Sequence, residues 1–368
     1  MPMTSKPERP KLPVSRILIV LMGSIGDVVR ALPLLGRIRR GHPAAHIAWV
    51  IEPKSLPIVE GHRWLDEVIV YDRSAPWSFP FMLRRIRAGR FDLVLDLQRH
   101  LKSGVVSFAS GAPKRLGFNR ANAKEFNHRF NTHEIAAQPP MRLKLMQYQA
   151  FGDALGLPAA PIEFGLEPEE NERRRAAEML ADAPRPLLAV ILGSSWPSRL
   201  YFPESTAEVI RKLAAPADGA PALFPVLIGA KEEVALAREL SDRLADMRYL
   251  DLCGRTRLRD LAAIFTECAG AFGPDCGPMH IAAAVGCPIV SLWGSTAPER
   301  SAPWGFAEFA IRGEIPCHPC YLRDCPIGRE CMRRIEADAV VAMVRKALAA
   351  GARVAPQFDR PSACVGLA

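Results

Sequence analysis

Two glycine-containing loops hold the residues whose types and spacing could do chemistry. The first, residues 23–27, ends in Asp27 and directly follows an apolar run. The second, residues 273–280, holds Asp275 and His280 and also follows an apolar run. Glycines let backbone N–H groups approach a ligand closely, and the N-terminus of a following helix favours an anion. The sequence therefore predicts two ligand-binding loops.

Asp27 lies in the expected first turn of the helix after the first loop. A carboxylate there would repel a pyrophosphate, but it could take a proton from a hydroxyl group as a general base. An acid in a first turn also complements the helix dipole without any role in chemistry. The local sequence leaves both interpretations open.

His280 is expected in the first turn of the helix after the second loop. Its ring could donate to a phosphate or ribose oxygen there, and the alternative is a structural histidine that bonds local carbonyls. A further loop, which follows the next apolar run, holds Ser295 and Thr296.

The elements that must position these loops are apolar runs that alternate with helical patterns. The runs expected to be strands are residues 16–21, 46–51, 68–71, 93–97, 187–192, 224–228, 249–252, 271–272 and 288–292. Continuous apolar strands between amphipathic helices are typical of parallel sheets covered on both faces. The sequence therefore predicts an α/β fold with ligand loops at the carboxyl ends of its strands.

The chain of 368 residues is longer than one hydrophobic core usually becomes, so two domains are expected. A segment with several prolines, residues 155–169, breaks both periodicities and marks their junction. We expect a disordered N-terminal tail (residues 1–15), an N-terminal domain (16–165) and a C-terminal domain (166–335). A closing helix, residues 336–350, could return to cover the N-terminal domain.

The net charge of +9 is unevenly distributed along the chain. Residues 1–160 carry a net charge of +12 and the remainder carries −3, so the first half is the expected partner of an anion. No nucleic-acid-binding signature is present, and a phosphorylated small molecule or lipid fits better. There is neither a signal-peptide pattern nor an apolar run of roughly 18 residues, so a cytoplasmic location is expected.

Together the two loops resemble the signature pair of glycosyltransferase family 9, the heptosyltransferases. The resemblance rests first on Gly23, Ser24, Ile25, Gly26, Asp27, Asp275, Cys276, Gly277, Pro278, Met279 and His280. Residues 96–103, 196–199 and 316–326 also resemble the family, in the same order. The similarity therefore extends over nearly the whole chain.

The resemblance implies a GT-B fold, in which two Rossmann-like domains with parallel sheets face each other across the reaction cleft. The implied reaction transfers a heptose from ADP-heptose to the Kdo/heptose inner core of lipopolysaccharide, with inversion at the anomeric carbon and Asp27 as general base. The acceptor would be a phosphorylated lipid A-core molecule at the inner face of the inner membrane. No metal cofactor is required if fixed cations stabilise the departing pyrophosphate.

The resemblance also assigns residues to the two ligands. The donor would be bound in the C-terminal domain by Arg199, Asp275, Cys276, Gly277, Pro278, Met279, His280, Ser295 and Thr296. The acceptor would be bound in the N-terminal domain by Gly23, Ser24, Ile25, Gly26, Gln98, Lys102, Arg120 and Lys124. For Arg120 and Lys124 a solvated basic surface is the alternative.

Two of these positions depart from the family pattern. Arg199 stands where the family often has lysine. Arginine keeps the positive charge but presents its N–H groups as a planar fork, so the geometry of its hydrogen bonds changes. Cys276 stands where serine or threonine is common, so a hydroxyl hydrogen bond does not carry over.

Four cysteines, Cys317, Cys320, Cys325 and Cys331, lie within fifteen residues near the end of the chain. Their spacing would allow a tetrahedral structural zinc site. The alternative is plain reduced thiols near the cleft.

The segment at residues 77–90 interleaves apolar side chains with arginines. This composition suits a helix that lies on an anionic membrane surface. An ordinary packed crossover helix shows the same pattern.

The sequence alone leaves other functions open. A related glycosyltransferase with another nucleotide sugar or surface-glycan acceptor would need only a few changed pocket contacts. An NAD-dependent oxidoreductase would explain two Rossmann-like halves and Glu52 at the end of the second strand. However, Ile25 and Val28 occupy two glycine positions of the dinucleotide-binding fingerprint.

Overall fold

The computed structural model describes residues 14–216 and 219–351. Of the tail expected at residues 1–15, only Val14 and Ser15 lie within the described residues. Ser15 is held by Asp92, whose Oδ2 accepts hydrogen bonds from the backbone N–H and the hydroxyl of Ser15.

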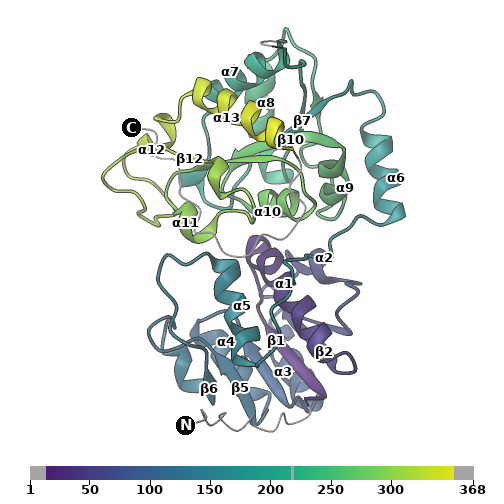
Figure 1. Cartoon of the computed structure of the whole chain (residues 1–368), viewed down its shortest axis with the longest axis vertical. Coiled ribbons are helices and arrows are strands. Elements are labelled where there is room, and N and C mark those ends of the chain that lie inside the picture. The colour runs from purple at the N-terminus through teal and green to yellow at the C-terminus, as the bar shows by residue number, and fades with distance from the viewer. Residues whose placement is uncertain (1–13, 217–218, 352–368) are drawn as a thin grey trace, which may run out of the picture.

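The chain forms two halves, each built around a parallel six-stranded sheet (Figure 1). The strand orders are β3-β2-β1-β4-β5-β6 and β12-β11-β10-β7-β8-β9. When the strands of each half are numbered along the chain and the second sheet is read from the β9 edge, both sheets have the order 3-2-1-4-5-6. This is the doubly wound order. Sheets of this order bind ligands where the order reverses, outside the carboxyl ends of the first and fourth strands. The prediction of an α/β fold with parallel sheets is confirmed.

The strands of the first sheet are β1 (Arg16–Val20), β2 (His46–Ile51), β3 (Glu67–Val70), β4 (Leu93–Asp96), β5 (Lys114–Gly117) and β6 (His133–Glu134). Those of the second are β7 (Leu187–Ile191), β8 (Phe224–Ile228), β9 (Leu250–Asp251), β10 (Cys268–Pro274), β11 (Ile289–Trp293) and β12 (Ala310–Arg312).

The helices of the first half are α1 (Ile25–Gly41), α2 (Leu56–Val59), α3 (Ser78–Ala88), α4 (Leu101–Ala109) and α5 (Lys144–Ala154). Those of the second are α6 (Glu170–Met179), α7 (Pro203–Ala214), α8 (Val234–Arg243), α9 (Asp260–Glu267), α10 (Gly277–Ala284), α11 (Pro298–Ser301), α12 (Glu330–Arg333) and α13 (Ala337–Ala350). Short 3-10 helices are η1 (Asn127–Phe130), η2 (Pro197–Arg199), η3 (Lys231–Glu233) and η4 (Ala307–Phe309).

Strand β1 shows why the sheets are covered on both faces. Ile17 and Ile19 belong to the larger hydrophobic cluster, whereas Leu18 and Val20 belong to a separate one. Successive side chains of a strand point to opposite faces, so each face of β1 contributes to its own core. A continuous apolar run is buried only when helices cover both sides of the sheet.

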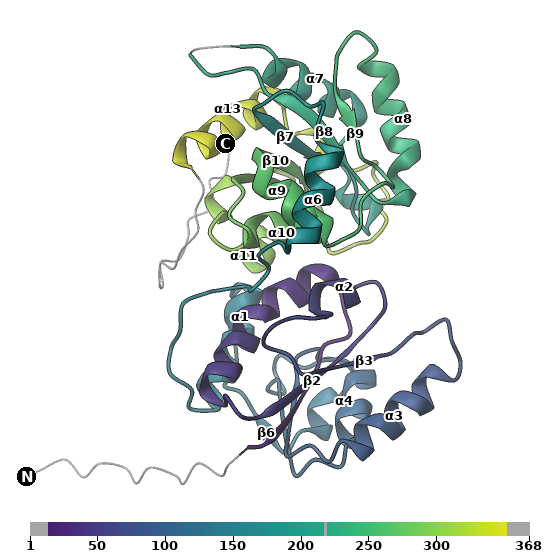
Figure 2. The ribbon, with the colours of Figure 1, turned by 90° about the vertical axis from the view of Figure 1, so that its right-hand side faces the viewer.

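The two halves are stacked so that their ligand loops meet. Figure 2 shows α1 and α2 of the first half facing α10 and α11 of the second, and α1 and α10 are in contact. Helix α1 follows β1 and helix α10 follows β10, the first and fourth strands of their sheets. Both predicted ligand loops therefore lie where the two halves meet.

Three short strands, β5, β6 and β12, were not predicted from the sequence. Strands β6 and β12 lie at sheet edges, and β5 and β6 carry charged residues such as Lys114, Arg115 and Glu134. Short, charged edge strands carry little of the apolar signal on which the prediction depended.

The closing helix is present as α13, but it does not cover the N-terminal domain. It packs on β10, β11 and α7 of the second half (Figure 1). Its residues Val340, Val344 and Ala347 are buried, and Leu348 lies 2.8 Å from where a Cβ on Gly270 of β10 would stand. This corrects the expectation, because the apolar stripe of α13 is buried by the sheet of its own half.

Helix α3 contains most of the arginine-rich segment. Met82 and Ile86 are fully buried, as expected of a packed crossover helix, whereas Trp77 and Phe81 are 83% and 69% exposed. Within the two described ranges, no helix combines the length and the apolar character needed to cross a membrane.

Candidate active site

The two predicted loops touch each other where the halves meet. A Cβ atom on Gly26 of α1 would lie 2.8 Å from Cδ2 of His280 on α10. A Cβ atom on Gly277 would lie 2.7 Å from Cγ2 of Ile25. Carbon atoms pack at about 3.5–4.0 Å, so only glycine allows the loops to come this close. The first and second loops therefore form one site.

Asp27 lies at this contact, in the first turn of α1. Its Oδ1 accepts from Arg30 Nη2 at 2.7 Å, from Lys144 Nζ at 2.5 Å and from the Tyr148 hydroxyl at 3.3 Å. Among the described residues, its Oδ2 accepts only a long hydrogen bond of 3.4 Å, from the hydroxyl of Ser24. One carboxylate oxygen is thus fully bonded, and the other is left for a ligand.

Asp27 is ionised at neutral pH. Burial by itself would raise the pKa of Asp27, but the charges and hydrogen bonds of Lys144 and Arg30 outweigh burial and hold this pKa well below its usual range. Burial and the charge of Asp27 raise the pKa of Tyr148 well above its usual value. The tyrosine hydroxyl is therefore a donor to a carboxylate.

Arg30 joins Asp27 to the second half. Its Nη1 donates to Nε2 of His280 at 2.8 Å and to the backbone oxygen of Ser301 at 3.1 Å. A guanidinium group can only donate, so His280 accepts as a neutral ring. Burial and then the charge of Arg30 hold the pKa of His280 well below its usual range.

Asp275 organises the second loop. Its Oδ2 accepts from the Thr296 hydroxyl at 2.7 Å and lies 3.2 Å from Arg199 Nη1. The Arg199 guanidinium lies over the ring of Trp196, 4.1 Å from its centroid, and its buried Nε has no partner among the described residues. Three predicted donor residues, Arg199, Asp275 and Thr296, therefore form one network.

The other members of the second loop begin helix α10. Cys276 is the residue before the helix, and Gly277 and Pro278 are its first two residues. Burial raises the pKa of Cys276 to about 12, so it stays a neutral thiol. Met279 is buried. These residues shape the start of the helix and leave its first backbone N–H groups near the cleft.

Two predicted acceptor residues lie at the carboxyl edge of the first sheet. Gln98 Oε1 accepts from the backbone N–H of Met22 at 3.0 Å and so joins the ends of β4 and β1. Lys102 Nζ lies 3.4 Å from Glu52 Oε1 and 3.9 Å from the centroid of the Tyr71 ring.

The other two basic acceptor residues, Arg120 and Lys124, are exposed in the segment between β5 and β6. In the described parts of the chain neither side chain is bonded to the cluster around Asp27. The backbone N–H of Lys124 donates to the backbone oxygen of Arg99 at 2.9 Å, which holds this segment against the end of β4.

Sequence reasoning missed four cations of the cleft, Arg30, Arg99, Lys144 and Arg300. Burial and then the charge of Arg300 lower the pKa of Arg99, so these two lie near each other across the halves. Arg30 could have been found as the i+3 partner of Asp27 on a helix. The other three belong to no local pattern and reach the site only through folding.

The four clustered cysteines are all reduced. Cys317 is exposed, Cys320 and Cys325 are partly exposed, and Cys331 is buried. The described residues contain no group of three or more His, Cys, Asp or Glu side chains arranged to hold a metal ion. The zinc site stays a prediction.

The segment that carries these cysteines packs against the donor loops. Ser295, a predicted donor residue, lies 2.8 Å from the Ser198 hydroxyl, and its backbone oxygen accepts from the N–H of Tyr321. The Nδ1 of His318 donates to the backbone oxygen of Gly294 at 2.6 Å. The segment thus supports the loop after β11.

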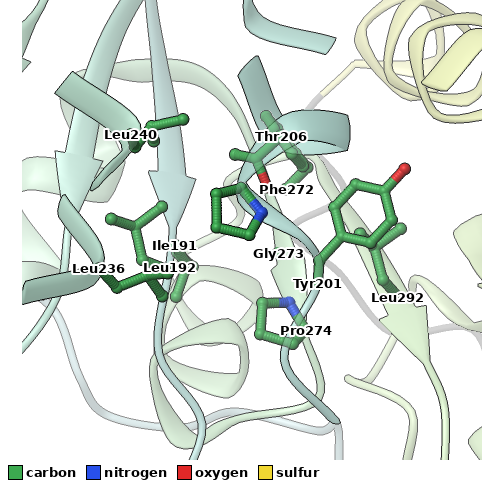
Figure 3. Close-up of a pocket in the computed structure, with 11 residues that line it drawn as sticks. Ile191, Leu192, Tyr201, Thr206, Leu236, Leu240, Phe272, Gly273, Pro274 and Leu292 are labelled. Atoms are coloured by element: carbon green, nitrogen blue, oxygen red, sulfur yellow. The ribbon is translucent and has the colours of Figure 1, made fainter. Parts of the chain in front are cut away.

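An apolar pocket lies beside the second loop, in the second half (Figure 3). It is lined by Ile191, Leu192, Tyr201, Pro203, Thr206, Leu236, Leu240, Phe272, Gly273, Pro274 and Leu292. Neither Asp27 nor Asp275 belongs to its lining. The charged cluster between the halves, and not this pocket, is therefore the candidate active site.

Fold and site define an enzyme of two doubly wound halves whose ligand loops meet at an ionised carboxylate. The profile of glycosyltransferase family 9 (heptosyltransferase) matches residues 81–330. The chain therefore belongs to glycosyltransferase family 9.

Individual proteins support this assignment over nearly the full length. The chain is 26% identical to lipopolysaccharide heptosyltransferase 1 of Pseudomonas aeruginosa over 327 residues, which cover 84% of this chain and 87% of that protein. A glycosyl transferase family 9 structure from Veillonella parvula has a TM-score of 0.75 at 22% identity and covers 93% and 99% of the two chains. ADP-heptose lps heptosyltransferase II of E. coli has a TM-score of 0.72 at 19% identity and covers 91% and 99%.

These similarities confirm the GT-B fold and the glycosyltransferase class. The alternative of an NAD-dependent oxidoreductase is wrong. Glu52, which suggested a ribose-binding acid, instead pairs with Arg73 at 2.5 Å and with Lys102.

Proposed function

We propose that this chain transfers a heptose from ADP-heptose to the Kdo/heptose inner core of lipopolysaccharide, with inversion and with Asp27 as general base. The Pseudomonas relative is a lipopolysaccharide heptosyltransferase, and the E. coli structure is that of an ADP-heptose lps heptosyltransferase. The observation that carries the proposal is the open Oδ2 of an ionised Asp27 where the two ligand loops meet.

Asp27 suits a single displacement. An acceptor hydroxyl attacks the anomeric carbon from the face opposite the pyrophosphate, and Asp27 Oδ2 takes its proton as the new bond forms. Because Arg30 and Lys144 hold Oδ1, the free oxygen has a defined orientation before the acceptor arrives. Such preorganisation places the reacting groups without further ordering.

The departing ADP gains negative charge as the sugar leaves, and Arg199, which pairs with Asp275 of the second loop, offers a cation for it. Arg199 is held in place by Asp275 and Trp196. The N-terminus of α10 adds its dipole. Fixed charges of this kind stabilise a leaving pyrophosphate, so the proposed reaction needs no metal cofactor.

The acceptor side is proposed to bind a phosphorylated lipid A-core molecule through Lys102, Arg120 and Lys124. Two of these cations, Arg120 and Lys124, are exposed, in the half that carries the positive charge. An acceptor with phosphates and acidic Kdo sugars would match them. The loop of residues 23–26 would lie beside the attacking hydroxyl.

The test is a transfer assay with ADP-heptose and an inner-core lipid acceptor, run beside ADP-glucose and UDP-glucose. We expect heptose transfer with inverted configuration. A thermal-shift screen of ADP, UDP, GDP and NAD should show stabilisation by ADP, about 2.7 kcal/mol when ADP is at 100 times its Kd. Transfer from UDP-glucose with stabilisation by UDP alone would instead support the alternative, another nucleotide sugar.

We also propose that the reaction takes place on the cytoplasmic face of the inner membrane, where α3 contacts the lipid. Trp77, the residue before α3, and Phe81 on α3 are exposed, and Arg84 and Arg87 follow them on that helix. Sedimentation with anionic vesicles should weaken in a Trp77→Ser, Phe81→Ser variant. The control is Phe126→Ser, at an aromatic residue that is 66% exposed in another segment, and equal loss in both variants would count against α3.

A further inference from the structure

Lys144, the first residue of α5, has no place in the function described so far beyond holding Asp27. Its Nζ lies 2.5 Å from Asp27 Oδ1, and its side chain is 18% exposed. Arg30 already donates to the same oxygen at 2.7 Å. Two cations on one carboxylate leave it ionised, but they also make it a very weak base.

This weakness conflicts with the task proposed for Asp27. A general base works best when its pKa lies near the working pH. With Lys144 charged, the pKa of Asp27 is held well below its usual range. The proton of the acceptor would therefore have no stable place on Asp27 after transfer.

The surroundings of Lys144 disfavour its charged form. Arg30 of α1, Arg99 beyond β4 and His280 of α10 lie around it, and Tyr148 lies one turn further along α5. Burial and then the charges of Arg30 and Arg99 lower the pKa of Lys144 to about 8, although Asp27 acts in the opposite direction. The lysine can thus lose its proton under conditions in which an exposed lysine keeps it.

We propose that Lys144 sets the basicity of Asp27 and is the final proton acceptor of the site, so that the reacting form holds Lys144 as a neutral amine. The inference rests on the proposed function of Asp27. In that form Arg30 alone pairs with Asp27, which is then a stronger base, and Nζ stays within hydrogen-bond distance of the carboxylate.

Every bond and proton of the step is accounted for. The acceptor oxygen forms its bond to the anomeric carbon while the bond from that carbon to the phosphate oxygen breaks, and its electron pair leaves with ADP. The acceptor proton goes to Asp27 Oδ2. The carboxyl group is a two-fold rotor, so a half-turn brings the protonated oxygen to Lys144 Nζ. The products are an Asp27 carboxylate and a Lys144 ammonium, which returns its proton to water when the cleft opens.

A merely structural lysine would supply a positive charge that positions Asp27. Under that role Lys144→Arg would keep activity and Lys144→Met would lose it. Under the proposal the order is reversed, because arginine remains charged and cannot accept a proton. Methionine leaves Asp27 with Arg30 alone.

The experiment measures kcat for heptose transfer between pH 6 and 10 in the complete enzyme. We expect the wild-type rate to rise with a midpoint near 8. Lys144→Arg should fall by about 10²-fold and show no such rise, and Lys144→Met should be more active than Lys144→Arg with a flat profile. Lys212→Arg, at an exposed lysine paired with Asp338, is the matched control and should follow the wild type. Higher activity in Lys144→Arg than in Lys144→Met would overturn the proposal.

A second measurement does not depend on the reaction. The pH dependence of Lys144 acylation by acetic anhydride, followed by mass spectrometry, reports its protonation directly. A midpoint near 8 supports the proposal, and a midpoint near the ordinary lysine value of about 10.4 contradicts it. If no heptose is transferred by the wild type, the proposed function fails while this titration still decides the state of Lys144.

Discussion

Arg30 in the first half donates from Nη1 to Nε2 of His280 in the second half over 2.8 Å. The other terminal nitrogen of the same guanidinium group, Nη2, donates to Oδ1 of Asp27. One side chain thus links the orientation of the carboxylate to the position of the second loop. The arrangement of Asp27 therefore depends on how the two halves close.

This link predicts a pH-dependent stability. The pKa of folded His280 is below its unfolded value, about 6.5, so the unfolded chain binds more protons as pH falls below that value. Neutral His280 contributes to the free energy of unfolding above pH 6.5. As the pH falls toward 5, this contribution is lost, and the free energy of unfolding decreases by up to about 1.4 kcal/mol per pH unit. Urea unfolding at pH 7, 6 and 5 should show this slope, and His280→Gln should reduce it.

His133→Gln serves as the control for this titration, because His133 is an exposed residue of the edge strand β6. Its slope should match the wild type. Equal slopes in all three proteins would mean that His280 is not held neutral by Arg30.

Asp27→Asn should fold, bind the donor and lose most of its turnover. General-base catalysis contributes about 10²–10⁴-fold, so kcat should fall by that factor. Asp153→Asn removes an aspartate that pairs with Arg37 of α1 at 2.8 Å, away from the cleft, and should keep its kcat. An Asp27→Asn enzyme with more than about a tenth of wild-type kcat would reduce Asp27 to a residue that complements the helix dipole.

Gly26→Ala should force the halves apart. The added Cβ would stand 2.8 Å from His280 Cδ2, and overpacking of this kind costs about 1–3 kcal/mol. We expect a larger radius of gyration in small-angle scattering and a lower kcat/KM. Gly23→Ala, whose Cβ would meet nothing closer than 3.7 Å, is the control for the scattering experiment. Unchanged scattering in Gly26→Ala would show that the halves do not close as tightly in solution.

Calorimetric titration of both ligands tests which half binds the donor and which half binds the acceptor. Asp275→Ala and His280→Ala should weaken ADP binding and spare acceptor affinity. Lys124→Glu and Arg120→Glu should weaken acceptor binding and flatten its salt dependence, because exposed charges are screened over about 10 Å at 0.1 M salt. If the N-terminal variants abolish ADP binding while the C-terminal ones spare it, the donor and acceptor halves are reversed.

The amino-acid sequence by itself determined the alternation of strands and helices, the two loops and the family. Apolar runs such as residues 16–21, and glycines placed after them as at Gly23 and Gly26, are local patterns that a buried parallel strand and a ligand loop impose directly. The short strands β5, β6 and β12 were not predicted, because strands of two to four residues that are charged or lie at a sheet edge impose no such pattern.

Only the tertiary structure decided which distant side chains surround Asp27. Lys144 follows it by more than a hundred residues and His280 by more than two hundred and fifty, so no local spacing connects them. Whether a buried carboxylate is a free base or a paired one depends on distances of about 3 Å between such distant segments. The difference between a bonded Oδ1 and an open Oδ2, and the place of α13 on its own sheet, exist only once the halves have packed.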